Sequence, residues 1–144
     1  MRLSAIGDVT HVLAIVRTLQ QAWPDTAITW VIGRVEARLI GLLPGVELII
    51  IDKRSLRAGA LALRRALRGR RFDVLLHMQT ALRASLYSML IPARVRVGFD
   101  RARARELQWL FTNRRIAPRT RQHVLDSFFG FTEAIGIPER RLEW

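Results

Sequence analysis

Ser4, Gly7 and Asp8 are the residues near the start of the chain whose types and spacing could do chemistry. The segment 2–11 reads as the end of a strand, a tight turn and the start of a helix, because the apolar residues from Val9 onward follow helical spacing. Small residues at such a turn let a ligand approach closely. In an open α/β sheet ligands bind at this edge, so Asp8 is a candidate general base for a bound hydroxyl. The alternative is that Asp8 only caps the helix, which would contribute about 1 kcal/mol.

Two arginine-rich stretches could bind phosphate groups. Residues 53–71 contain eight basic residues and no acid, and residues 94–121 contain nine arginines with Phe99, Trp109 and Phe111 among them. Arginine binds phosphate through a bidentate fork, and interleaved aromatic rings can stack on nucleic-acid bases. Solvated helix faces and core aromatics are the simpler explanations, so we expect no nucleic-acid partner.

The other reactive residue types give no recognisable site. His11, His77 and His123 lack the spacing of a metal site. His77 lies in an apolar strand as a core or edge residue, whereas His123 begins the last helix beside a basic loop and could contact an anionic ligand. The chain has no cysteine, which excludes a disulfide framework and a thiolate metal site. We therefore predict no bound metal.

Composition indicates one domain with a basic surface. The chain has 144 residues, half of them apolar, which is enough for a single core. It carries 24 Lys and Arg against 12 Asp and Glu, a net charge of +12 that favours anionic partners. No signal peptide and no run of 18 apolar residues is present.

Helices and strands alternate in the pattern of βαβ units, which predicts a Rossmann-like parallel sheet flanked by helices. Residues 1–3 form only a stub of a first strand, so that strand is either absent or begins upstream. The strand at 72–78 is apolar enough to be buried on both faces, and the one at 94–99 alternates charge like an edge strand. We predict helices over 8–22, 36–43, 56–67, 81–90, 103–111 and 123–135, and strands over 26–32, 46–51, 72–78 and 94–99.

Six motifs occur in an order that resembles a known family. They are RLSAIGDVTH at 2–11, WPD at 23–25, RFDVLLHMQ at 71–79, VGFDRARARE at 97–106, FTNRR at 111–115 and QHV at 122–124. This ordered set resembles the N-terminal domain of the lipopolysaccharide heptosyltransferases, glycosyltransferase family 9, over essentially the whole chain.

The resemblance implies a GT-B architecture, in which two Rossmann-like domains face each other across a cleft. Residues 1–144 would be the acceptor-binding domain, and the C-terminal donor-binding domain would be absent. The reaction would transfer a heptose from ADP-heptose to the lipid A-core acceptor, with inversion and without a metal or cofactor. The resemblance also implies a cytoplasmic location, in peripheral contact with the anionic inner membrane.

The resemblance further assigns roles to individual residues. Asp8 would be the general base, and the other residues would shape the turn or line the acceptor cleft: Ser4, Gly7, Arg54, Gln79, Arg105 and His123. The segment around Gln79 departs from the commoner D-x-Q-G-L-x-K-S pattern. His77, Thr80 and Arg83 replace its acid, glycine and lysine, which indicates a divergent subfamily.

We expect this chain by itself to be inactive, because the donor site would lie elsewhere. Two further hypotheses belong to other classes. The chain could be a non-catalytic basic α/β module that binds anionic lipid or nucleic acid, or an unstable remnant without function.

Overall fold

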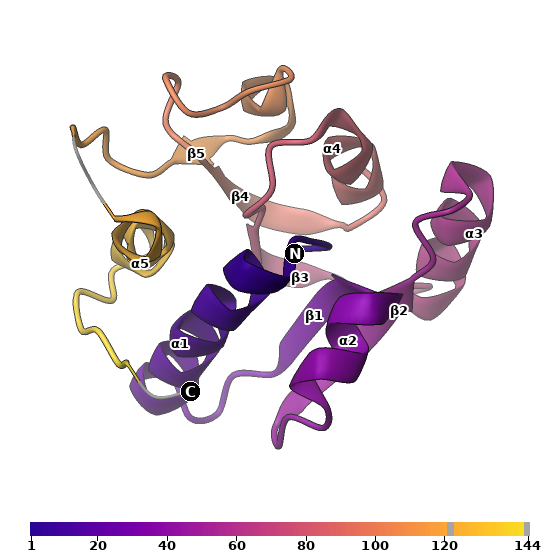
Figure 1. The fold of residues 1–144 in the computed structure, drawn as a ribbon, viewed down its shortest axis with the longest axis horizontal. Helices are drawn as coiled ribbons and strands as arrows, with labels where there is room; N and C mark the ends of the chain where they lie inside the picture. The colour runs from indigo at the N-terminus through magenta and orange to yellow at the C-terminus, as the bar shows by residue number, and fades with distance from the viewer. Residues whose placement is uncertain (121–122, 143–144) are drawn as a thin grey trace.

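Helices and strands alternate along the chain as the hydrophobic spacing predicts (Figure 1). The computed structural model describes residues 1–120 and 123–142. The helices are α1 (Ile6–Ala22), α2 (Arg34–Ile40), α3 (Leu56–Ala66), α4 (Leu82–Ser88), the 3-10 helix η1 (Gln108–Phe111) and α5 (Val124–Ala134). The strands are β1 (Ile28–Gly33), β2 (Val46–Ile51), β3 (Phe72–Leu76), β4 (Ala93–Gly98) and β5 (Arg114–Arg115).

The strands form two parallel sheets, one with the order β1-β2 and one with the order β3-β4-β5. Residues 1–3 lie between the two sheets and hydrogen-bond to both. On one side the Arg2 N–H donates to Val31 O at 3.2 Å, and on the other the Met78 N–H donates to Met1 O at 3.1 Å. The predicted stub is therefore the central strand segment, which gives the strand order of a Rossmann-like fold, with β2 and β5 outermost.

Helices cover both faces of this composite sheet. α1, α2 and α5 pack on one face around a core that includes Ile15, Trp30 and Phe131. α3 and α4 pack on the other face around a core that includes Ile51, Leu63 and Tyr87. The parallel sheet flanked by helices is confirmed.

Two predictions about the strands are wrong. β4 is an inner strand, because β5 pairs with its last two residues. Its charge is accommodated because Arg96 donates to the carbonyl oxygens of Ser88 at 2.6 Å and Ile91 at 2.8 Å, at the end of α4. β3 is not buried throughout, since Asp73 is exposed and Phe72 only half-buried.

The predicted helix over 103–111 is confirmed only at its end, as η1. Tight turns, in which Asp100 accepts from the backbone of Arg103, replace its first half. Across the described ranges of the chain, no helix has the length and apolar character needed to cross a membrane.

Candidate functional site

The predicted site residues follow the carboxyl ends of the parallel strands. Ser4 follows the central N-terminal segment, Arg54 lies in the loop after β2, Gln79 follows β3, and Arg105 lies in the loop after β4. Asp8 lies in the first turn of α1, which begins at the same edge. In open parallel sheets this carboxyl edge is the usual position of a ligand site.

Gln79 holds the N-terminal segment in place at the carboxyl edge. Its side-chain oxygen accepts a hydrogen bond from the Leu3 N–H at 2.7 Å, and its amide nitrogen donates to Ser4 Oγ at 3.1 Å. The fully buried Gln108 side chain donates to the backbone oxygens of Gln79 and His77, at 3.1 and 2.7 Å. Sequence reasoning missed Gln108, because no local pattern distinguishes a buried glutamine in a 3-10 helix from an exposed one.

Asp8 forms an ion pair with Arg2, which sequence reasoning also missed. Arg2 donates as well to Met78 O, and its guanidinium carbon lies 5.5 Å from the centroid of the Phe128 ring. The side chains of Arg2 and Asp8 are 13% and 30% exposed. The helix-cap alternative for Asp8 is wrong, because Ala5 is the N-cap of α1 and no side chain caps it.

This ion pair leaves part of the Asp8 carboxylate available. Burial lowers the pKa of Arg2, and the charge and hydrogen bond of Asp8 act in the opposite direction. A guanidinium stays protonated in proteins, so the contact is an ion pair. Arg2 contacts Asp8 Oδ2, and within the described residues Oδ1 has no hydrogen-bond partner. A carboxylate held in this way can accept a proton from a hydroxyl bound beside it.

The sequence predicted Gly7 in a tight turn before the helix. This prediction is wrong, because Gly7 lies in the first turn of α1. The helix begins earlier because the Val9 N–H donates to Ala5 O at 2.9 Å, so the first helical turn already includes Gly7. Gly7 is exposed, and a Cβ added there would meet no atom of the described residues within 4 Å. The backbone beside Asp8 is therefore open to an approaching molecule.

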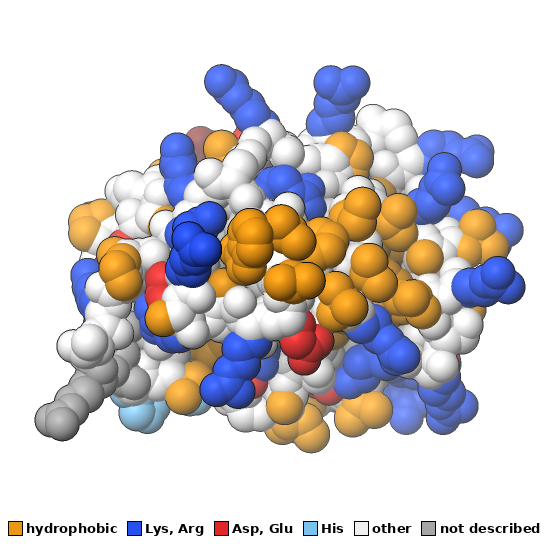
Figure 2. Space-filling view, turned by 90° about the horizontal axis from the view of Figure 1, so that it is seen from above, with side chains coloured by type: hydrophobic (Ala, Val, Ile, Leu, Met, Phe, Trp, Pro, Cys, Tyr) orange, Lys and Arg blue, Asp and Glu red, His pale blue; other side chains and the backbone are white. Residues whose placement is uncertain are grey.

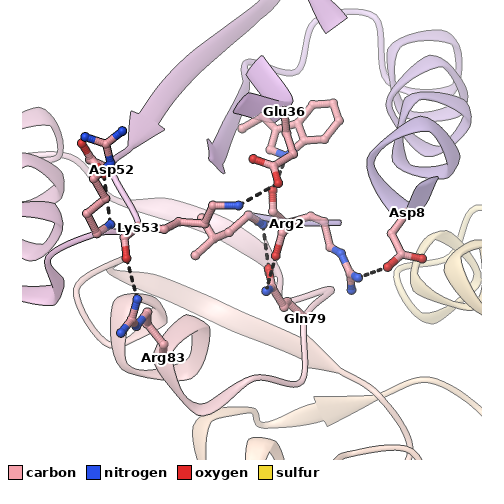
Figure 3. A network of polar contacts seen from close by, with 11 residues as sticks. Arg2, Asp8, Glu36, Asp52, Lys53, Gln79 and Arg83 are labelled. Carbon is pink, nitrogen blue, oxygen red and sulfur yellow. Dashed lines mark hydrogen bonds and ion pairs between the residues drawn. The ribbon is translucent and has the colours of Figure 1, made fainter. Parts of the chain in front are cut away.

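A partly buried ion pair, between Lys53 and the buried Glu36, lies farther along the carboxyl edge, toward β2 (Figure 3). Lys53 Nζ is 2.7 Å from Glu36 Oε1, and their side chains are 35% and 5% exposed. Gly33 permits this packing, because a Cβ there would lie 2.3 Å from Glu36 Oε2 and 2.4 Å from Leu3 O. Sequence reasoning placed both charged residues in the right elements but could not pair them, since β2 separates them.

Arg54 is exposed beside this pair, and its backbone N–H donates to Asp52 Oδ1 at 3.0 Å. Arg34 Nη2 lies 3.6 Å from Asp52 Oδ2, and Arg83 Nη1 donates to Lys53 O at 2.5 Å. We call Arg34, Lys53, Arg54 and Arg83 the cationic corner. Four cations around two carboxylates leave this corner suited to an anionic group.

His123 and Arg105 lie on other segments than the cationic corner. The Arg105 loop touches the start of α4, because the Leu82 N–H, next to Arg83, donates to Glu106 Oε2 at 2.6 Å. His123 is the N-cap of α5, where its Nδ1 accepts a hydrogen bond from the Leu125 N–H at 3.3 Å. Its role at the helix start is confirmed, and its ring lies edge-on to that of His11, 6.0 Å between centroids. The Arg105 side chain is exposed in the loop before η1.

The structure thus divides the predicted residues into groups. Ser4 and Gln79 touch directly, and Arg2 links Asp8 to the same segment (Figure 3). His123 lies on α5, which packs against α1. Lys53, next to Arg54, lies on the far side of Arg2 from Asp8 (Figure 3). Arg121 and Gln122, which belong to the second basic stretch and to the QHV motif, lie outside the described residues.

His77 is a core residue, as the sequence predicted. Its Nε2 lies 3.0 Å from Ser85 Oγ, and the side chain is fully buried. Burial, together with the charges of the Met1 ammonium, Arg96 and Arg2, lowers its pKa to about 3. Within residues 1–120 and 123–142, no group of three or more His, Asp or Glu is placed to hold a metal ion.

Phe99, one of the aromatics within the second basic stretch, is also a core residue. Its ring packs edge-on against Phe131 at 5.0 Å and Phe128 at 6.3 Å between centroids. It is 8% exposed and therefore provides no stacking platform for a base.

The parallel sheet, its flanking helices and the polar carboxyl edge define a Rossmann-like ligand-binding domain. Comparison with known proteins identifies the family within this class. The family model for glycosyltransferase family 9 (heptosyltransferase) matches residues 60–144. The chain is 46% identical over all of its 144 residues to the lipopolysaccharide core heptosyltransferase OpsX of Haemophilus influenzae, of which it covers 42%.

Solved structures agree with this assignment. The chain matches E. coli heptosyltransferase WaaC with ADP at a TM-score of 0.80 and 27% identity, covering 94% of this chain and 48% of that one. WaaC with ADP-2-deoxy-2-fluoro heptose matches at a TM-score of 0.81 and 26% identity, with 100% and 51% covered. The chain therefore belongs to glycosyltransferase family 9, the heptosyltransferases. It spans less than half the length of its curated relative and about half that of the solved structures.

Proposed function

We propose that this chain is the acceptor-binding domain of a heptosyltransferase that transfers heptose from ADP-heptose to the inner core of lipopolysaccharide. The observation that carries the proposal is the placement of Asp8. Its carboxylate lies at the carboxyl edge of the sheet, is paired through one oxygen with Arg2, and is flanked by the open backbone of Gly7.

In this mechanism Asp8 removes the proton from the acceptor hydroxyl. The resulting oxygen nucleophile forms a bond to the anomeric carbon of the heptose while the bond to ADP breaks, which inverts the configuration at that carbon. The negative charge leaves with ADP, and the proton remains on Asp8. ADP-heptose is a substrate here, bound by residues outside this chain, and no metal or cofactor takes part.

Arg2 would position the carboxylate that acts as the base. Met78 O and the Phe128 ring hold the guanidinium, and Arg2 in turn holds Asp8 Oδ2. This arrangement restricts the orientation of Asp8, and a base in a fixed orientation is more effective than a mobile one. Ser4 and Gln79 support the same segment from the other side.

The acceptor would be anionic, as phosphorylated and acidic core sugars are. The cationic corner offers the exposed Arg54 and Arg83 at one end of the carboxyl edge. Arg105 is exposed in the loop after β4, and His123 is exposed at the start of α5. These residues fit a long acceptor that extends along the edge and passes Asp8, although they do not form one cluster.

The decisive experiment uses a longer form of the protein that includes a donor-binding domain. Asp8→Asn is compared with Asp25→Asn, an exposed acid in the turn after α1. Transfer from ADP-heptose to a lipid A-core acceptor should fall by about 100-fold or more in Asp8→Asn, the usual cost of losing a general base. Asp25→Asn should retain full activity. Equal activity of the two variants would contradict the assignment of Asp8 as the base.

We also propose that the domain works in the cytoplasm in contact with the anionic face of the inner membrane. Figure 2 shows Lys and Arg side chains around an apolar area on one face of the molecule. The exposed apolar residues include Leu82 and Leu86 of α4 and Leu110 of η1. Binding to vesicles that contain anionic lipid, and not to purely zwitterionic vesicles, would support this location. Equal binding to both would contradict it.

A further inference from the structure

The loop of residues 99–107 joins β4 to η1 at the carboxyl edge, and it carries Arg105. In Figure 1 the short helix η1, at the end of this loop, lies beside α4, and the two helices are in contact. The Arg105 side chain is exposed, and among the described residues it forms no hydrogen bond or ion pair. A guanidinium of this kind is available to an anionic ligand.

Asp100 and Arg103 fasten the first half of this loop. The backbone N–H groups of Arg103 and Ala104 donate to Asp100 O at 3.1 and 2.8 Å, and the Arg103 guanidinium pairs with the buried Asp100 carboxylate. Arg103 Nη1 also donates to Ser127 Oγ of α5 at 2.6 Å. The backbone on the amino side of Arg105 is therefore fixed against α5.

Glu106 fastens the second half of the loop to α4. The Leu82 N–H donates to Glu106 Oε2 at 2.6 Å. Leu82 is the first residue of α4, and the N–H groups of a first helical turn have no partner within the helix. The Glu106 carboxylate supplies this partner, in a charge-assisted hydrogen bond that is stronger than a neutral one. The loop that carries Arg105 is thus attached to α4 as well as to α5.

The backbone directly after Arg105 has an unfavourable conformation. Glu106 and Leu107 have φ angles of 50° and 60°, in the left-handed region. Side chains with a Cβ avoid this region, so two successive non-glycine residues adopt it only where other contacts compensate. The attachment of Glu106 to α4 is one such contact, and the Gln108 N–H, which donates to Arg105 O at 3.1 Å, is another. Strained segments of this kind cluster at functional sites.

We propose that Glu106 is a positioning residue for acceptor binding, which acts through Arg105. Its hydrogen bond to α4 keeps the backbone of Arg105 in one conformation, so the guanidinium binds an anionic acceptor group with little loss of conformational freedom. Arg83 of the cationic corner directly follows Leu82, so the same bond joins the segments of both arginines, and both serve the same acceptor. This inference rests on the proposed function, because it takes the acceptor as the ligand of Arg105.

The first test measures transfer kinetics in a longer form of the protein that includes a donor-binding domain. Glu106→Ala should raise the KM for the acceptor about fivefold, because it removes a hydrogen bond made by a charged group. It should leave kcat and the KM for ADP-heptose within about twofold, since only acceptor binding is affected. Glu106→Gln keeps an oxygen that accepts from the Leu82 N–H, so it should restore the acceptor KM.

The matched control is Glu47→Ala. Glu47 is an exposed acid near the amino end of β2, away from the carboxyl edge, and it accepts a hydrogen bond from Arg70 at 2.7 Å. This variant also loses a charge-assisted hydrogen bond, but it should keep the acceptor KM of the unaltered protein. A rise in KM shared by Glu47→Ala and Glu106→Ala would overturn the inference.

A double variant separates positioning from a merely structural role. Arg105→Ala should raise the acceptor KM about tenfold or more, because it removes charge-assisted hydrogen bonds to the acceptor. The combination of Arg105→Ala and Glu106→Ala should match Arg105→Ala by itself, because Glu106 acts through Arg105. Effects that multiply would overturn the inference.

Two other results would distinguish this inference from the proposed function. A raised acceptor KM in Arg105→Ala with an unchanged one in Glu106→Ala would overturn the positioning role and leave the proposed function standing. An unchanged acceptor KM in Arg105→Ala would overturn both the positioning role of Glu106 and the acceptor role of Arg105.

A second measurement tests the hydrogen bond itself and needs no transfer activity. Hydrogen exchange of the Leu82 amide in the 144-residue chain reports on the partner of that amide. Glu106→Ala should speed this exchange about tenfold, whereas Glu106→Gln and Glu47→Ala should not. Equal exchange rates in Glu106→Ala and the unaltered chain would overturn the inference, whatever the activity of the longer form.

Discussion

Arg2 and Asp8 lie six residues apart in the sequence and form an ion pair. They meet because Arg2 lies in the N-terminal strand segment and Asp8 lies in the first turn of the helix that follows it. Arg2 points to the α1 and α5 face of the sheet, while its neighbours Met1 and Leu3 belong to the core on the other face. Alternation along a strand produces this arrangement. Asp8 then lies in the first turn of α1, where the helix dipole favours a negative charge.

Gly7→Ala separates the functional role of Gly7 from its structural role. A Cβ at this position meets no atom within 4 Å in the part of the chain that the structure describes, and the residue lies inside α1. Alanine should therefore stabilise the fold by about 0.5 kcal/mol or more, because glycine is a poor helix former. If an acceptor approaches this backbone, the same change should raise the KM for acceptor in a longer, active form. Chemical denaturation and transfer kinetics measure the two effects.

The matched control is Gly59→Ala in α3, on the face of the sheet opposite α1. A Cβ there would lie 2.3 Å from Tyr87 Oη, so this variant should lose about 1–3 kcal/mol of stability. An unchanged acceptor KM in Gly7→Ala would contradict close approach of the acceptor at Gly7.

At the scale of single residues, the sequence predicted positions better than partners. Ser4, Asp8 and Gln79 could be placed at one edge because each follows a strand or begins a helix. The sequence could not predict the contacts of Arg2, Lys53 and Gln108. Each contact joins different elements of the fold, and the distance between those elements depends on packing. Family resemblance supplied the role of Asp8, and spacing by itself favoured the helix cap that proved wrong.

At the scale of elements, the ion pair between Lys53 and Glu36 ties the loop after β2 to α2. Glu36 is 4% exposed as a residue, and its Oε2 has no hydrogen-bond partner among the described atoms. A buried carboxylate that loses its one cation is strongly unfavourable. The cationic corner therefore contains one structural cation, Lys53, next to the exposed Arg54.

Lys53→Met and Arg54→Met should differ in their effects for this reason. Lys53→Met should destabilise the fold by about 3 kcal/mol, since it leaves Glu36 buried without a counter-ion. Arg54→Met should change stability by less than about 0.5 kcal/mol, as exposed substitutions usually do. Arg54→Met should instead weaken acceptor binding in a longer form. Urea denaturation of both variants checks the difference, and equal stability losses would contradict it.

The positions of helices and strands in the sequence were also predicted more reliably than the order of the strands in the sheet. The strong apolar periodicity of α1, α3 and α5 was sufficient to place these helices. The inner position of β4 was not predictable, because its alternating charges suit an edge strand. Tertiary structure overrides this pattern, since Arg96 donates to the carbonyl oxygens at the end of α4. The short β5 that covers β4 carries no apolar signal.

At the scale of the whole molecule, the N-terminal segment hydrogen-bonds to both sheets, and no strand of one sheet pairs with a strand of the other among the described residues. Near this junction His77 is buried, and burial, with the charges of the Met1 ammonium, Arg96 and Arg2, lowers its pKa. His77 follows β3 and is held by β4 and α4, because its backbone N–H donates to Val97 O at 2.8 Å and its Nε2 lies 3.0 Å from Ser85 Oγ. Its protonation is therefore coupled to the folding of this part of the sheet.

Folding stability should consequently fall with pH below neutrality. The unfolded chain protonates His77 near its ordinary pKa of 6.5, whereas the folded chain does so only near pH 3. Between these values the unfolded state binds the extra proton, so stability is complete above pH 6.5 and is lost as pH falls. Going from pH 7 to pH 5 should cost about 2 kcal/mol through His77. Urea denaturation at both pH values measures this loss.

His77→Asn should remove that part of the pH dependence and leave the part due to the Met1 ammonium, whose lowered pKa acts in the same direction between pH 8 and 5. The comparison uses the difference between pH 7 and pH 5 within each protein, because asparagine also changes stability at every pH. Thr132→Val is the matched control, since Thr132 is a buried residue that does not titrate and donates to Phe129 O at 2.9 Å. It should lower stability equally at both pH values. The same pH 7-to-5 loss in His77→Asn as in the unaltered chain would show that His77 is not the group responsible.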